Sequence, residues 1–203
     1  MNIWIIIWLI FWFSIMGLPN YLFKKYKITY YQNSWQHTLF FIFSSIILFI
    51  VYQNYFSSYF NNFSLYYLLI ILCLFLLWLF LPAIYKNDYY TKKERFGYQL
   101  PKFFEVLFQQ FCFLAGLLTF GISPIAFGTL FFVVHIPMLF FAPKKFVFFI
   151  SAGSLIGGLI FAYLQSYGIF GFLITLFIHL SFWASFHYAL SRKYFLGITP
   201  LKR

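Results

Sequence analysis

The stretch Lys102–Gln110, KFFEVLFQQ, places the acidic residue Glu105 at the start of a long apolar segment. A charged side chain at membrane depth costs about 2.5–3.5 kcal/mol on insertion scales, so a retained carboxylate is a candidate functional group with partners on neighbouring helices. Two histidines, His135 and His179, lie within later apolar segments and are the expected partners. These three residues are therefore the candidate catalytic residues.

The composition is that of a polytopic membrane protein. Apolar residues make up 64% of the 203 residues and occur in long uncharged runs. Since no long polar insert is present, we expect residues 1–203 to form a single all-α transmembrane bundle in contact with membrane lipids. The net charge of +11 comes from basic residues between the apolar runs or in the C-terminal tail, so nucleic acid is not an expected partner.

The apolar runs predict seven transmembrane helices, because a bilayer core about 30 Å thick needs about 20 apolar residues per helix. The predicted spans are Ile3–Leu22, Thr38–Phe56, Ser64–Tyr85, Phe103–Phe120, Ile122–Ala142, Phe146–Leu164 and Ile169–Leu190. The first run has no preceding basic residue and no small-residue cleavage pattern, which favours a retained span over a signal peptide.

The basic residues predict the orientation of this bundle. All 14 Lys and Arg residues follow the first, third, fifth or seventh span, and the other three connections contain none. Cytoplasmic loops are enriched in Lys and Arg. We therefore expect a multi-pass protein of a bacterial inner membrane, with its N-terminus outside and its C-terminus in the cytoplasm.

Two local patterns predict how the helices pack. Gly153 and Gly157 have GxxxG spacing, with Ser154 and Gly158 one position further round, which is typical of a close helix–helix contact. Pro137 lies two residues after His135 and is expected to interrupt the helix there, because proline removes a helical hydrogen bond.

One glutamate and two histidines can serve either general-base activation of water or metal binding. His179 and His187 are eight residues apart and no HExxH motif is present, so neither a metal nor another cofactor is expected. Structural roles are the alternative. A histidine can hydrogen-bond across helices, and Glu105 can reach the interface or pair with Lys102.

Three segments resemble the motifs of the CAAX protease and bacteriocin-processing (CPBP, or Abi) family of intramembrane endopeptidases. They are Phe104–Gln110 (FEVLFQQ), Phe131–His135 (FFVVH) and His179–Trp183 (HLSFW), which correspond in order and spacing to EExxxR, FxxxH and HxxxN or HxxxD. The resemblance covers residues 101–190, and residues 1–100 form divergent N-terminal helices. It implies hydrolysis of a peptide bond in a membrane-associated peptide or protein. In that reaction Glu105 and His135 would activate water, and His179 would stabilise the oxyanion.

The sequence also departs from these motifs. Phe104 replaces the first glutamate, Gln109 replaces the arginine, and Trp183 replaces the Asn or Asp of the third motif. The indole N–H of Trp183 can still donate one hydrogen bond. The expected supporting residues of the site are Gln109, Phe131, Trp183 and His187.

Two other function classes are the alternatives to a peptidase. The chain could be an inactive family member that acts as a membrane scaffold or regulatory subunit of a complex. A proton-coupled transporter is disfavoured because the seven spans show no internal repeat.

Overall fold

Helices are the only regular secondary structure in residues 3–26, 28, 33–84, 92–121, 123–140 and 144–185, which the computed structural model describes. The first three are α1 (Ile3–Trp12), α2 (Leu18–Lys25) and α3 (Ser34–Val51), and a π-helical segment, Phe13–Gly17, joins α1 to α2. They are followed by α4 (Gln53–Tyr59), α5 (Leu65–Ile84), α6 (Lys92–Phe120), α7 (Pro124–Val133), a 3₁₀ helix (Ile136–Phe140), α8 (Lys144–Gln165) and α9 (Ile169–Ala184). The predicted all-α class is confirmed.

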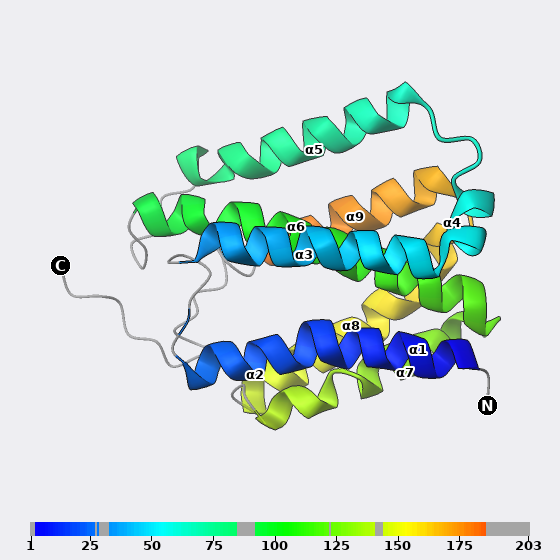
Figure 1. The fold of residues 1–203 in the computed structure, drawn as a ribbon, viewed down its shortest axis with the longest axis horizontal. Coiled ribbons are helices and arrows are strands. Elements are labelled where there is room, and N and C mark those ends of the chain that lie inside the picture. Colours follow the sequence, from blue (N-terminus) through cyan, green and yellow to red (C-terminus); the bar gives the residue numbers. More distant parts are fainter. Residues whose placement is uncertain are drawn as a thin grey trace.

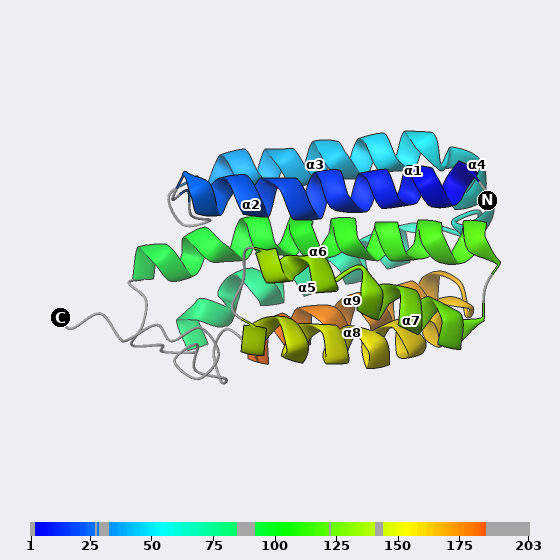
Figure 2. The same cartoon turned by 90° about the horizontal axis from the view of Figure 1, so that it is seen from below.

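The helices run lengthwise along an elongated bundle with α6 at its centre (Figure 1). Figure 2 shows α6 between a layer that contains α1, α2 and α3 and a layer that contains α7, α8 and α9. Helix α6 contacts α1, α3, α4, α5, α8 and α9, whereas α5 lies at the edge and packs on α6 and α9.

Four of the helices are long and apolar enough to cross a membrane. They lie at Ser34–Val51, Leu65–Ala83, Gly97–Phe120 and Lys144–Gln165, and three shorter apolar segments lie at Ile3–Gly17, Pro124–Leu139 and Ile169–Ala184. Each of the seven overlaps a predicted span, and four of them have the length of a membrane-spanning helix. The length and composition of the four longer helices fit a membrane protein.

The chain leaves the α-helical conformation beside His135, as Pro137 predicts. Helix α7 ends at Val133, and the N–H of His135 bonds to the carbonyl of Phe132, three residues earlier. In a continuing α-helix the ring of Pro137 would clash with the carbonyl of Val133. Instead, a 3₁₀ helix that contains Pro137 begins at Ile136, directly after His135.

The close contact of α8 is offset by one residue from the Gly153–Gly157 pair. A Cβ atom on Gly153 or Gly157 would meet nothing within 4 Å, whereas one on Gly158 would lie 2.9 Å from the Cα of Gly128 on α7. The Ser154–Gly158 row therefore faces α7. The predicted packing face is therefore present on this helix, and of the two rows of small residues it is Ser154 and Gly158, not Gly153 and Gly157, that meets Gly128.

An aromatic cluster between α1, α6 and α7 holds the bundle together next to the candidate site. The indole N–H of Trp8 donates to the carbonyl of Cys112 at 2.6 Å, and that of Trp12 donates to the carbonyl of Val134 at 3.3 Å. Both indoles are buried, so these bonds satisfy polar atoms that would otherwise be costly in the core. They tie the N-terminal helix to the two helices that carry Glu105 and precede His135.

Candidate functional site

A row of buried polar side chains lies along α6. Lys102, Glu105, Gln109 and Gln110 are 5%, 4%, 6% and 0% exposed. Their spacing of three, four and one residues keeps them on one side of the helix. Buried polar groups in an apolar bundle need hydrogen-bond partners, and the contacts of this row define the candidate site.

The carboxylate of Glu105 is held by two side chains of its own helix. Lys102 Nζ lies 2.8 Å from Oε2, and Gln109 Nε2 donates to Oε1 at 3.0 Å. The alternative role predicted for Glu105, a pair with Lys102, is therefore present.

Lys102, which the sequence offers as a topological charge and as an alternative partner of Glu105, has a second contact at the site. Its ammonium lies 3.8 Å from the ring centroid of Trp183 on α9, as well as 2.8 Å from Glu105. A cation over an indole face is attracted by the ring quadrupole. The positive charge beside Glu105 thus comes from the preceding helical turn, while Gln109 occupies the position of the motif arginine.

His179 on α9 is fixed by polar contacts at both ring nitrogens. The amide of Gln110 lies 2.9 Å from Nδ1, and the indole N–H of Trp183 donates to Nε2 at 3.1 Å. The imidazole also stacks on Phe113, with a centroid separation of 5.9 Å. Trp183 uses its N–H on His179, so in this arrangement the N–H does not point to an oxyanion.

Two polar residues behind Gln110 were not recognised from sequence. The amide of Gln165, at the end of α8, lies 3.0 Å from that of Gln110 and 3.3 Å from Thr175 Oγ1 on α9. Both residues are at most 1% exposed. The only signal for Gln165 was a polar residue at the end of an apolar run, where a loop residue is equally expected.

His135 lies among aromatic side chains. Its Nδ1 is 2.6 Å from the carbonyl of Phe131, and its ring packs on Trp12 at a centroid distance of 5.3 Å. The ring centroid of Phe113 lies 3.9 Å from that of Phe131 and 5.9 Å from that of His179.

The structure therefore joins some of the predicted residues directly and others through intermediates. Glu105 connects to His179 through Lys102 and Trp183, and His135 connects to His179 through Phe131 and Phe113. Within the part of the chain that is described, no group of three or more metal-ligating side chains occurs. The predicted supporting residue His187 lies outside the described residues.

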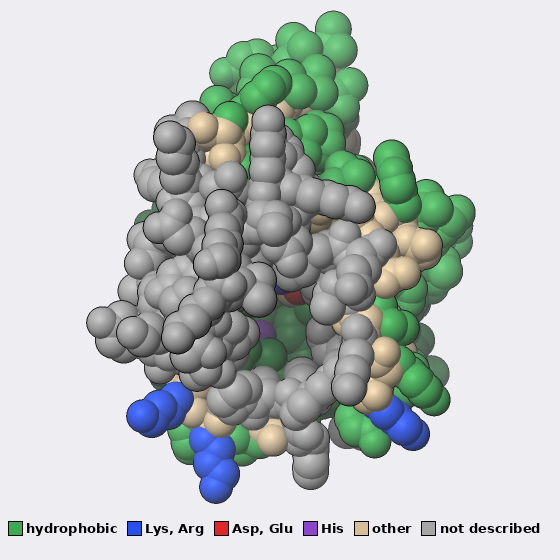
Figure 3. Space-filling view, turned by 90° about the vertical axis from the view of Figure 1, so that its left-hand side faces the viewer, with side chains coloured by type: hydrophobic (Ala, Val, Ile, Leu, Met, Phe, Trp, Pro, Cys, Tyr) green, Lys and Arg blue, Asp and Glu red, His purple; other side chains and the backbone are tan. Residues whose placement is uncertain are grey.

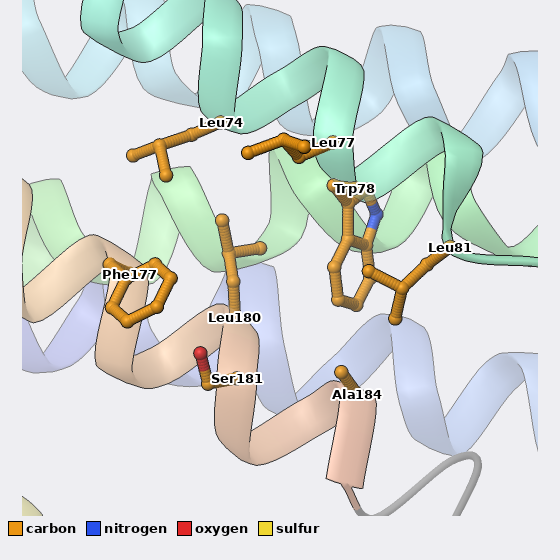
Figure 4. Close-up of a pocket in the computed structure, with 8 residues that line it drawn as sticks. All are labelled: Leu74, Leu77, Trp78, Leu81, Phe177, Leu180, Ser181 and Ala184. Atoms are coloured by element: carbon orange, nitrogen blue, oxygen red, sulfur yellow. The ribbon is translucent and has the colours of Figure 1, made fainter. Parts of the chain in front are cut away.

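In the view onto the end of the bundle at which α6 begins, a histidine and an acidic side chain are visible (Figure 3). A separate groove lies between α5 and α9 and is lined by Leu74, Leu77, Trp78, Leu81, Phe177, Leu180, Ser181 and Ala184 (Figure 4). Its walls are almost entirely apolar, and it contains none of the three candidate catalytic residues.

Comparison with known proteins assigns no family: no family model, no curated protein and no solved structure matches the chain.

Proposed function

We propose that this protein crosses a bacterial inner membrane seven times, with its N-terminus outside and its C-terminus in the cytoplasm. The four long apolar helices and three shorter apolar segments supply seven candidate spans. All Lys and Arg residues follow the first, third, fifth or seventh of these spans. Single cysteines placed in successive connections test this topology by labelling of intact cells with an impermeant thiol reagent. Labelling restricted to the connections without Lys or Arg is expected, and labelling of the basic connections would overturn the orientation.

Within that topology the protein acts as a divergent intramembrane endopeptidase of the CPBP type. The observation that supports this most is the continuous set of contacts from the buried Glu105 and Lys102 through the half-buried Trp183 to His179. A carboxylate and an imidazole linked across two central helices can activate water where bulk solvent is largely excluded. The substrate is a membrane-associated peptide or protein whose scissile bond reaches Glu105 and His179.

The reaction is peptide-bond hydrolysis. A water oxygen adds to the carbonyl carbon, its proton passes to Glu105 or to His179, and a tetrahedral intermediate forms. The C–N bond then breaks, the protonated base returns the proton to the leaving nitrogen, and a carboxylic acid and an amine are released. The ammonium of Lys102 lies where it can stabilise negative charge near Glu105.

The test is cleavage of a library of membrane-anchored peptides by the purified protein in lipid nanodiscs. Glu105→Gln should lower cleavage by at least about 100-fold, since general-base catalysis contributes about 10²–10⁴-fold. Glu94→Gln is the matched control, a substitution of the same type outside the row of Lys102, Glu105, Gln109 and Gln110. A folded wild-type protein that cleaves nothing, or cleavage unaffected by Glu105→Gln, would refute the proposed mechanism.

A second candidate function is a non-catalytic scaffold or regulatory subunit, and one observation favours it. Both oxygens of Glu105 and both ring nitrogens of His179 already have protein partners. One of these contacts, between Gln110 and His179, joins α6 to α9, as the interhelical hydrogen bonds that hold a bundle together do. Co-purification of a stoichiometric partner that binds equally well to the Glu105→Gln, His135→Ala and His179→Ala variants would support the scaffold. Loss of both partner binding and peptide cleavage in these variants would support the enzyme.

A further inference from the structure

The hydrogen bonds of His179 determine which ring nitrogen carries its proton. The indole Nε1 of Trp183 lies 3.1 Å from Nε2 of His179. An indole N–H is a donor only, so Nε2 must accept. A neutral imidazole has one accepting nitrogen and one N–H. The proton of a neutral His179 therefore lies on Nδ1, whereas an imidazolium would place two donors, Nε2–H and the indole N–H, face to face.

This assignment also orients the amide of Gln110. A proton on Nδ1 needs an acceptor, and the Gln110 amide, 2.9 Å away, is the group that faces it. The structure places Nε2 of Gln110 at this distance, which would set two donors face to face. The oxygen and nitrogen ends of a side-chain amide are assigned from their hydrogen bonds, so we exchange them and direct the carbonyl oxygen of Gln110 to Nδ1. Its NH₂ group consequently points to Gln165, 3.0 Å away.

Gln165 is compatible with this direction of hydrogen bonding. Its Nε2 lies 3.0 Å from Gln110 Oε1 and 3.3 Å from Thr175 Oγ1. When the O and N ends of both amides are exchanged, Gln165 Oε1 accepts from the NH₂ group of Gln110. The hydroxyl of Thr175 donates to the carbonyl of Phe172 at 2.8 Å, so this exchange gives up the contact between Gln165 and Thr175. The indole N–H of Trp183 cannot accept a hydrogen bond, so it sets the direction at His179.

We propose that Gln110, supported by Gln165, is a positioning residue that fixes His179 as its Nδ1–H tautomer. The Nε2 lone pair then faces the side of α9 where Trp183 and Lys102 lie. Within the proposed hydrolysis, on which this role rests, His179 is a proton acceptor at Nε2 and the indole N–H of Trp183 covers that lone pair until substrate displaces it. This differs from the oxyanion-donor role that the motif resemblance implies for His179.

The tautomer can be measured by ¹⁵N NMR of histidine-labelled protein in lipid nanodiscs at neutral pH. Couplings between the ring carbon-bound protons and the two nitrogens distinguish the protonated nitrogen from the one with a lone pair, and His179→Gln identifies the signals of His179. The expected result is a protonated Nδ1 and an unprotonated Nε2. A protonated Nε2 in the wild-type protein would overturn the inference.

Three variants test the role of Gln110. Gln110→Leu removes the acceptor and should abolish the predominance of the Nδ1–H form, whereas Gln110→Glu keeps an acceptor and should preserve it. Gln109→Leu removes a buried amide one residue earlier that bonds to Glu105 instead, so the His179 signals should not change. An unchanged tautomer in Gln110→Leu would overturn the positioning role.

The wild-type measurement and Gln110→Glu remain decisive if Gln110→Leu does not fold. The readout needs no substrate, so it separates this inference from the proposed function. A protein that cleaves no peptide but shows the Nδ1–H form would refute the hydrolysis and leave the tautomer assignment in place.

Discussion

Helices α5 and α6 are both long enough to cross a membrane, yet they lie in opposite environments. In the membrane-length window of α6, 67% of the residues are buried, against 11% in α5. Helix α5 consists mainly of Leu, Ile and Phe, whereas α6 carries Lys102, Glu105, Gln109 and Gln110. The more polar helix is thus at the centre of the bundle and the more apolar helix at its edge (Figure 1).

This comparison shows that polar partners, rather than hydrophobicity, determine which helix is central. Lipid chains are as apolar as leucine, so α5 gains little by burial against other helices. Unpaired polar groups in hydrocarbon cost several kcal/mol each, so α6 is surrounded by residues that satisfy them. The positions at which single substitutions should be most costly are therefore the polar residues of α6.

The largest effect is expected for loss of the Lys102 charge. Lys102→Met leaves the buried carboxylate of Glu105 without the ammonium 2.8 Å away, and breaking a buried pair in this way costs about 3–5 kcal/mol. Adding Glu105→Gln should restore most of the lost stability. Denaturant unfolding in detergent micelles measures the double-mutant cycle, with Leu77→Met on the exposed face of α5 as the control. A single variant as stable as the wild type would mean that the pair does not hold α6 in the centre.

A smaller effect is expected where α7 and α8 approach most closely. Gly158→Leu would place its Cβ 2.9 Å from the Cα of Gly128 and 3.1 Å from the Cβ of Phe131, and overpacking of this kind costs about 1–3 kcal/mol. Gly157→Leu is the matched control, because a Cβ there meets nothing within 4 Å. Thermal unfolding of the two variants compares them directly. Equal losses would show that both faces of α8 are packed.

The attachment of α5 to α6 should be weaker than either of these contacts. The indole N–H of Trp78 on α5 donates to the carbonyl of Gln99 on α6 at 2.7 Å, so Trp78→Phe removes a hydrogen bond worth about 0.5–1.5 kcal/mol. The same substitution at Trp35, which is 67% exposed on α3, provides the control. Hydrogen exchange of α5 should increase in the Trp78 variant only; an increase in both would point to a general loosening.

The smallest effect is expected on the outer face of α5. Phe80 is 63% exposed, so Phe80→Leu should change the free energy of unfolding by no more than about 0.5 kcal/mol. Phe108 on α6 is fully buried, and Phe108→Leu should cost more because it leaves unfilled volume in the core. Measurement in the same detergent compares the two. Equal costs would contradict the contrast between the edge and the centre of the bundle.

The pair between Lys102 and Glu105 could be predicted from the sequence. Its members are three residues apart, a spacing that brings side chains together on any α-helix. The end of α7 near His135 was predictable for the same local reason, since Pro137 cannot continue the helix. The donor capacity of Trp183 also followed from its chemistry. Its actual acceptor, His179, required knowledge of the side-chain orientations on α9.

The contacts of Gln110 and Gln165 were not predictable in this way. These residues are 55 positions apart, on α6 and α8, and neither belongs to a motif. The choice of Ser154 and Gly158 over Gly153 and Gly157 was equally hidden, because spacing gives the faces of a helix but not which face meets a neighbour. Lys102 was misjudged as a loop charge because α6 begins ten residues before it.

The sequence by itself determined that the chain is helical, that its composition suits a membrane, and that a carboxylate and two imidazoles lie in apolar surroundings. Local spacing and hydropathy carry that information, because each helix satisfies its own backbone. Only the tertiary structure decided which helix is central and that Lys102, Trp183, Gln110 and Gln165 complete the surroundings of Glu105 and His179. Those contacts depend on the rotation of each helix against its neighbours, which is set by the packing of the whole bundle.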